Sequence, residues 1–91
     1  MSASGILIEV SGRVQGVFFR ASTKEFCDRL GIVGWVKNLP TGNVLIHAQG
    51  PIEQISKLKD WCRQGPPLSK VSEVLDQNTK MGAFKDFEIR Y

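Results

Sequence analysis

The stretch GRVQGVFFR, residues 12–20, joins an apolar strand pattern that starts near Ile6 to a helical pattern that continues to Leu30. Its two glycines let the backbone curl where the strand ends, because a residue without a Cβ adopts positive φ freely. Arg20 stands where the helix begins, although a cation there opposes the helix dipole by roughly 0.3–1 kcal/mol. Unpaired N–H groups at a helix N-terminus bind anions well. The stretch therefore predicts an anion site, with phosphate as the expected ligand.

Hydrophobic periodicity on both sides of this junction predicts the remaining elements. Alternating apolar residues favour strands over residues 5–10, 32–38, 43–49, 70–76 and 87–91. Apolar residues at helical spacing favour helices over residues 22–30 and 51–63. Gly31 ends the first helix, and Gly65-Pro66-Pro67 ends the second. A polar stretch, residues 77–82, is expected to connect the last two strands.

The predicted order is β-α-β-β-α-β with a further short strand at the C-terminus. This order is typical of an α+β fold, the ferredoxin-like split βαβ sandwich, with two helices on one face of a mostly antiparallel sheet. A chain of 91 residues is long enough for one compact domain and too short for two, so we expect a single domain over residues 1–91. In this fold the end of the second strand approaches the start of the first helix, which would bring Asn38 close to Arg20.

The composition is that of an ordinary globular chain, with 42% hydrophobic residues, 23% charged residues and a net charge of +3. The basic residues are scattered rather than clustered, so an attraction for small anions fits them as well as binding to RNA does. No apolar run approaches the ~20 residues of a membrane span, and the first five residues lack the features of a signal peptide. We therefore expect a cytoplasmic location and no membrane partner.

Two cysteines, Cys27 and Cys62, fall in the two predicted helices. Free cysteine is among the most buried residue types, so we interpret both as small buried thiols. A disulfide would require the two helices to touch, and none is expected in a reducing cytoplasm. Their wide spacing and the single His47 match no metal site. We therefore expect no metal.

The loop before the first helix supplies the candidate binding groups. Its successive N–H groups can form a concave anion site, and the planar guanidinium of Arg20 can donate to two phosphate oxygens at once. The amide of Asn38 can accept a hydrogen bond from a water while it donates one to a phosphate. The candidate phosphate-binding N–H groups are those of Gln15, Gly16, Val17, Phe18 and Phe19.

Each of these candidates also has an ordinary structural interpretation, and the local sequence leaves both readings open. The loop could be a plain strand-to-helix connection that leaves Arg20 in solvent. Asn38 could be an Asx-turn residue that bonds its own backbone near Pro40.

No combination of side chains suggests a nucleophile activated by a base. His47 is expected to be exposed on the strand face away from the core, where no nucleophile accompanies it. Trp35 and Trp61 are interpreted as packing groups, and no two carboxylates are spaced for acid–base work. Any chemistry would therefore depend on positioning and electrostatics, as phosphoryl transfer can.

Two segments together resemble the acylphosphatases. They are the stretch of residues 12–20 and the later stretch Gly34-Trp35-Val36-Lys37-Asn38-Leu39-Pro40-Thr41-Gly42-Asn43-Val44. Both segments are present in the expected order and separation, and the resemblance extends from Ile6 to Tyr91. One position departs from it: Leu45 stands where many members carry a glutamate, which we interpret as a change on the surface.

The resemblance implies hydrolysis of the carboxyl–phosphate bond of acyl phosphates, with inorganic phosphate as a product and with no metal or cofactor. Arg20 and the loop N–H groups from Gln15 to Phe19 would bind the phosphoryl group, and Asn38 would orient the attacking water. It also favours a monomer that acts on a small molecule.

Two functions without catalysis remain as alternatives. One is an anion-sensing module that uses the same groups. The other is an RNA-binding ferredoxin-like module, which would need aromatic residues on the open face of the sheet. The strand residues expected on that face, such as Glu9, Leu45 and Gln49, do not provide a stacking surface, so we expect no nucleic-acid partner.

Overall fold

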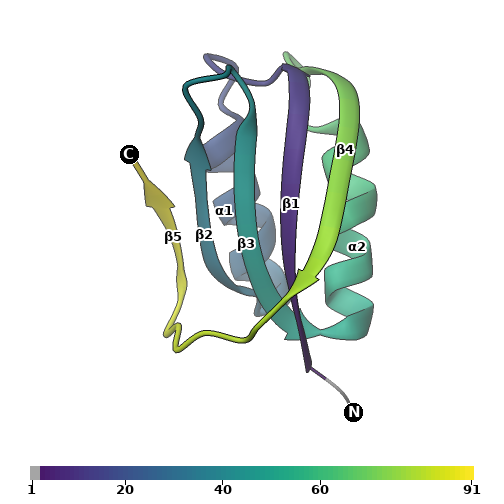
Figure 1. Ribbon diagram of the computed structural model, residues 1–91. Helices are drawn as coiled ribbons and strands as arrows, with labels where there is room; N and C mark the ends of the chain where they lie inside the picture. Colours follow the sequence, from purple (N-terminus) through teal and green to yellow (C-terminus); the bar gives the residue numbers. More distant parts are fainter. Residues whose placement is uncertain (1–2) are drawn as a thin grey trace.

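Two helices cover one face of a five-stranded sheet in the computed structural model, which describes residues 3–91 (Figure 1). In chain order the elements are β1 (Ala3–Arg13), α1 (Phe19–Leu30), β2 (Val33–Asn38), β3 (Val44–Pro51), α2 (Ile52–Gln64), β4 (Lys70–Thr79) and β5 (Phe87–Arg90). The strand order is β4-β1-β3-β2-β5, and all neighbours are antiparallel except β2 and β5. The α+β ferredoxin-like sandwich predicted from the sequence is confirmed.

The hydrophobic core lies between the sheet and the two helices, because alternate residues of the central strands point toward the helices. On β1 and β3 these buried residues are Ile6, Ile8, Val10, Val44, Ile46 and Ala48. The helices contribute Phe19, Thr23, Cys27, Ile55, Leu58 and Cys62. The apolar alternation that predicted strands here therefore matches the buried faces of β1 and β3, whereas Ile52, at the apolar spacing of α2, is exposed.

Both cysteine thiols are free and fully buried. Burial raises the pKa of the Cys62 thiol to about 12. Burial also raises the pKa of the Cys27 thiol, and the nearby Cys62 raises it further. Both thiols therefore stay protonated at neutral pH, and their interpretation as buried packing groups is confirmed.

The outer strands differ from their predicted limits. β4 continues to Thr79 instead of ending at Asp76, because Gln77 and Asn78 pair with β1. These residues are exposed at the edge of the sheet, so they carry no apolar alternation that could reveal a strand. β5 ends at Arg90, and Tyr91, which the alternation assigned to the last strand, follows it.

The open face of the sheet is crossed by the segment 80–86, which leads from β4 to β5 (Figure 1). The Gln49 side chain donates to the Gly82 carbonyl at 2.9 Å and accepts from the Gly82 N–H at 2.8 Å. The Phe84 ring packs edge-on against His47, with 5.1 Å between ring centroids. The expectation that His47 is exposed is therefore wrong: the side chain is half-buried, and its Nε2 atom is fully covered.

Candidate functional site

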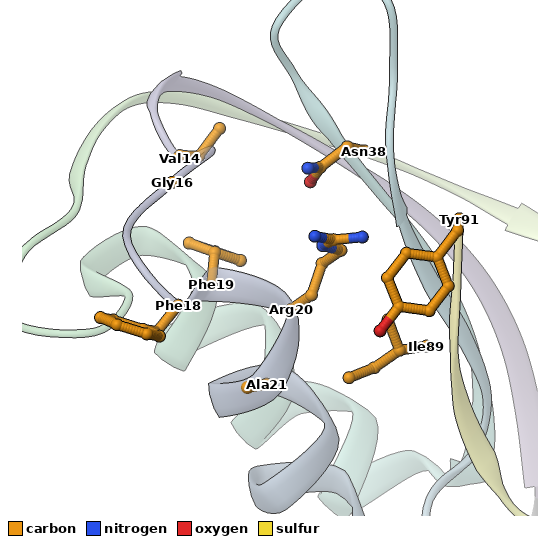
Figure 2. A pocket seen from close by; sticks show the side chains of 9 residues that line it. All are labelled: Val14, Gly16, Phe18, Phe19, Arg20, Ala21, Asn38, Ile89 and Tyr91. Carbon is orange, nitrogen blue, oxygen red and sulfur yellow. The ribbon is translucent and has the colours of Figure 1, made fainter.

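The C-terminal ends of β1 and β2 lie at the same end of the sheet, because both strands are antiparallel to β3. β5 runs parallel to β2, so its C-terminus lies at that end as well. A cavity of about 310 Å³ opens at this corner, where α1 begins (Figure 2). It is lined by Val14, Gly16, Phe18, Phe19, Arg20, Ala21, Asn38, Ile89 and Tyr91.

The predicted site residues do not all face this cavity. Arg20 and Asn38 both line it, as do three of the five residues proposed to supply N–H groups, namely Gly16, Phe18 and Phe19. The side chain of Val17 instead belongs to the hydrophobic core. Gln15 is half-buried and lies outside the lining.

The loop between β1 and α1 owes its shape to two residues in the left-handed region. Gly16 has φ 74°, and Phe18 has φ 66° and is the only non-glycine residue with positive φ in residues 3–91. Such a conformation costs a residue with a Cβ roughly 1–2 kcal/mol. It lets α1 begin at Phe19, earlier than the predicted Ser22, so that Arg20 lies in the first turn without any acidic residue beside it.

Backbone donors of this loop have no acceptor of their own. Within residues 3–91, none of the N–H groups from Gln15 to Phe19 donates a hydrogen bond to another protein group. The carbonyl of Phe18, in contrast, accepts from the N–H of Ser22 at 3.0 Å and continues the helix. Free donors at a helix start form a site for a negatively charged ligand.

The side chain of Gln15 ties the loop to the β2–β3 turn. Its Nε2 atom donates to the carbonyl of Leu39 at 2.9 Å and to that of Asn43 at 2.8 Å. These two bonds hold the loop beside the strand end that carries Asn38. The sequence analysis considered only the N–H of Gln15, and no local pattern could have paired its side chain with residues so distant along the chain.

Asn38 presents a polar atom to the cavity. Its Oδ1 atom is buried and has no hydrogen-bond partner within residues 3–91. The interpretation of Asn38 as an Asx-turn residue is therefore wrong, because an Asx turn needs that oxygen as an acceptor. In the turn itself, the N–H of Asn43 donates to Thr41 Oγ1 at 3.3 Å instead. Figure 2 shows the amide directed toward Arg20 across the cavity.

The guanidinium of Arg20 carries an unneutralised charge. It takes part in none of the ion pairs or side-chain hydrogen bonds found among residues 3–91. Its Cζ atom lies over the ring of Tyr91, 4.9 Å from the ring centroid. The side chain is half-buried and lines the cavity, so Arg20 does not extend freely from the surface.

Among the lining residues that were not predicted as part of the site, Ile89 and Tyr91 are far from the others along the chain. They reach it because β5 pairs with β2, with Ile89 beside Val36. The alternating apolar pattern of the last residues signalled a strand but gave no sign of which edge of the sheet it would join.

Two other features, a metal site and a membrane-spanning helix, are absent from the described residues. Residues 3–91 contain no group of three His, Cys, Asp or Glu side chains placed to hold a metal ion. None of the described helices is long and apolar enough to cross a membrane.

Taken together, the fold and the corner define a small α+β sandwich whose cavity gathers backbone N–H groups without acceptors and an arginine without an ion-pair partner among residues 3–91. The family model of the acylphosphatases matches residues 6–89. An acylphosphatase of Acaryochloris marina is 48% identical over 80 residues, which cover 88% of this chain and 86% of that relative.

Solved structures agree with this match. An acylphosphatase structure from Coxiella burnetii superposes with a TM-score of 0.94 at 40% identity, covering 97% of this chain and 93% of the other. One from Bacillus subtilis gives 0.93 at 33% identity, with 99% and 100% covered. The chain belongs to the acylphosphatase family and is a hydrolase acting on acid anhydrides.

Proposed function

We propose that this enzyme hydrolyses the carboxyl–phosphate bond of acyl phosphates through the corner described above. The observation that carries the proposal is the meeting of three unsatisfied groups at one cavity. These are the guanidinium of Arg20, the free N–H groups of the loop and the buried oxygen of Asn38. The two sets of donors suit the oxygens of a phosphoryl group, and the one acceptor suits the water that attacks it.

In the proposed complex the phosphoryl group is held by the N–H groups from Gln15 to Phe19 and by Arg20. The guanidinium donates to two oxygens at once, a geometry that the point charge of a lysine does not reproduce. Loop dipoles and guanidinium are fixed before the substrate arrives, so they stabilise the developing charge without reorganisation. The exposed side chain of Phe18 stands at the rim, beside the acyl group.

The second part of the proposal concerns the water. Asn38 Oδ1 accepts a hydrogen bond from the water and holds it in line with the bond that breaks. The water oxygen attacks phosphorus, and the phosphorus–oxygen bond to the acyl group breaks. The carboxylate leaves with the bonding electrons and is stable without a proton, so no strong general acid is needed.

The proton of the water passes to the phosphate in this proposal. The side chains that line the cavity include no histidine, lysine, aspartate or glutamate that could take it. The reaction as proposed uses no metal and no cofactor. A single domain over residues 1–91, a monomeric state, a cytoplasmic location and the lack of a nucleic-acid partner stay predictions.

The deciding experiment is hydrolysis of benzoyl phosphate by the purified protein in EDTA, beside the variant Arg20→Ala. Arg63 offers a matched control, because it is an exposed arginine in the last turn of α2 that pairs with Asp60 and does not line the cavity. We expect turnover in the parent and in Arg63→Ala, and its loss in Arg20→Ala. If the parent binds inorganic phosphate but turns nothing over, the chain is an anion-sensing module instead.

A further inference from the structure

The contact between Arg20 and Tyr91 has no role in the chemistry proposed so far. The guanidinium carbon lies over the Tyr91 ring at 4.9 Å from its centroid, and both side chains line the cavity (Figure 2). The residue is 99% exposed, so it contributes nothing to the hydrophobic core. Packing of the hydrophobic core therefore does not account for the contact between Tyr91 and Arg20.

β5 is tied to α1 and β2 near its start, which holds the strand that leads to Tyr91 beside the helix that carries Arg20. The buried ring of Phe87 anchors β5 in the core, and the Phe87 carbonyl accepts from Lys24 Nζ of α1 at 3.0 Å. The N–H of Gly34 also donates to the Asp86 carbonyl at 3.0 Å, which holds the start of β5 against β2. The ring and the guanidinium thus come from two elements that are joined to each other.

An aromatic ring and a carboxylate restrain an arginine side chain in different ways, because only the carboxylate occupies its N–H donors. A carboxylate would bind the N–H donors of Arg20 and cancel its charge, so a phosphate would have to displace it. An aromatic ring attracts the cation through its face and takes none of the hydrogen bonds that the guanidinium can donate. A ring therefore restrains the side chain while leaving its charge and donors to the ligand.

We infer that Tyr91 is a positioning residue, whose ring holds the Arg20 guanidinium in the geometry that binds the phosphoryl group. The inference rests on the proposed function where turnover is concerned. Binding of inorganic phosphate tests it separately, because phosphate needs the guanidinium but has no acyl group.

The test compares Tyr91→Leu, which removes the ring, with Tyr91→Phe, which keeps it. The dissociation constant of inorganic phosphate is measured by calorimetry for both variants and the parent. We expect Tyr91→Leu to weaken binding about two- to fivefold, the effect of a cation–π contact at an exposed site. Tyr91→Phe should bind like the parent. Unchanged phosphate binding in Tyr91→Leu would overturn the inference.

Two further readouts separate positioning from other roles. Nitrogen-15 relaxation of the Arg20 Nε–H group should show a more mobile side chain in Tyr91→Leu, while circular dichroism shows that the fold is kept. The KM values for benzoyl and acetyl phosphate should rise by the same factor. A rise for benzoyl phosphate alone would mean that the ring contacts the acyl group instead, and would overturn the inference.

Failure of the proposed function looks different from failure of this inference. A chain that turns over neither substrate but binds phosphate less tightly in Tyr91→Leu would retain the role of Tyr91 and lose the hydrolase mechanism.

Discussion

The two helices begin in opposite ways, although each follows a central strand of the same sheet. α2 begins at Ile52, directly after β3 ends at Pro51, and carries Glu53 in its first turn. α1 starts after a curled loop, with Arg20 in its first turn and no acidic residue there. An acid at a helix start is stabilising and a cation is destabilising. The comparison teaches that the charge at the start of α2 favours the helix, whereas the charge at the start of α1 opposes it, at the cavity that we propose binds an anion.

The largest expected effect is at Arg20. Replacement by alanine should lower kcat/KM for benzoyl phosphate about 10³-fold or more, since an arginine at a transferring phosphoryl group can supply that much. Arg20→Lys should lose about 10²-fold, because it keeps the charge but not the planar pair of donors. Steady-state kinetics on both variants check this. Near-parental activity in Arg20→Lys would mean that charge alone matters at the start of α1.

The next effect is at Asn38, which has no counterpart near the start of α2. Asn38→Ala should lower kcat about 10²-fold, because the water loses its orientation. The affinity for inorganic phosphate should stay as in the parent, because the loop and the guanidinium are untouched. Both quantities are measured, by kinetics and calorimetry. Lost phosphate binding with kcat preserved would contradict the assigned role.

A pair of glycines separates backbone strain from binding. Gly16 in the loop and Gly31 at the end of α1 have φ of 74° and 71°, and an added Cβ would meet nothing within 4 Å at either. Each alanine variant should therefore lose a similar stability, about 1–2 kcal/mol, in urea unfolding.

Only the loop variant of this pair should affect the site. Gly16→Ala shifts the N–H groups beside the cavity and should weaken phosphate binding, while Gly31→Ala should bind phosphate like the parent. Equal phosphate affinities in the two variants would remove the loop backbone from the proposed site.

The smallest effect tests the comparison of the two helix starts directly. Glu53→Gln should lower the free energy of unfolding by about 0.3–1 kcal/mol, and Arg20→Ala should raise it by a similar amount. Both shifts should shrink in 1 M salt, because exposed charges are screened. Urea unfolding at low and high salt measures them. If the free energy of unfolding changed in the same direction in both variants, the charge of Arg20 would not be destabilising at the start of α1.

The sequence was sufficient for features that depend on neighbours along the chain. Alternation revealed the buried faces of β1 and β3. The charge of Arg20 at a helix start pointed to the corner that we propose binds an anion, and the topology predicted that Asn38 would lie there too, as the shared cavity shows. These inferences needed only local patterns and one topological rule.

Features that depend on distant contacts were not predictable in this way. His47 is covered because the segment 80–86 crosses the open face, and Tyr91 reaches Arg20 because β5 joins the edge beside β2. The side chain of Gln15 acts on backbone carbonyls of a separate turn. In each case the local pattern gives no sign of the partner, because the packing of the whole chain determines it.

The pairing of β1 with β4 has a consequence for how the enzyme folds. Gly5 lies opposite Thr79, and β5 reaches β2 only after the chain has returned across the sheet. Contacts between residues far apart in the chain form slowly, since loop-closure entropy is lost before they stabilise anything. Arg20 meets Tyr91 only when the last strand docks, so a chain still emerging from the ribosome holds its arginine without the ring beside it.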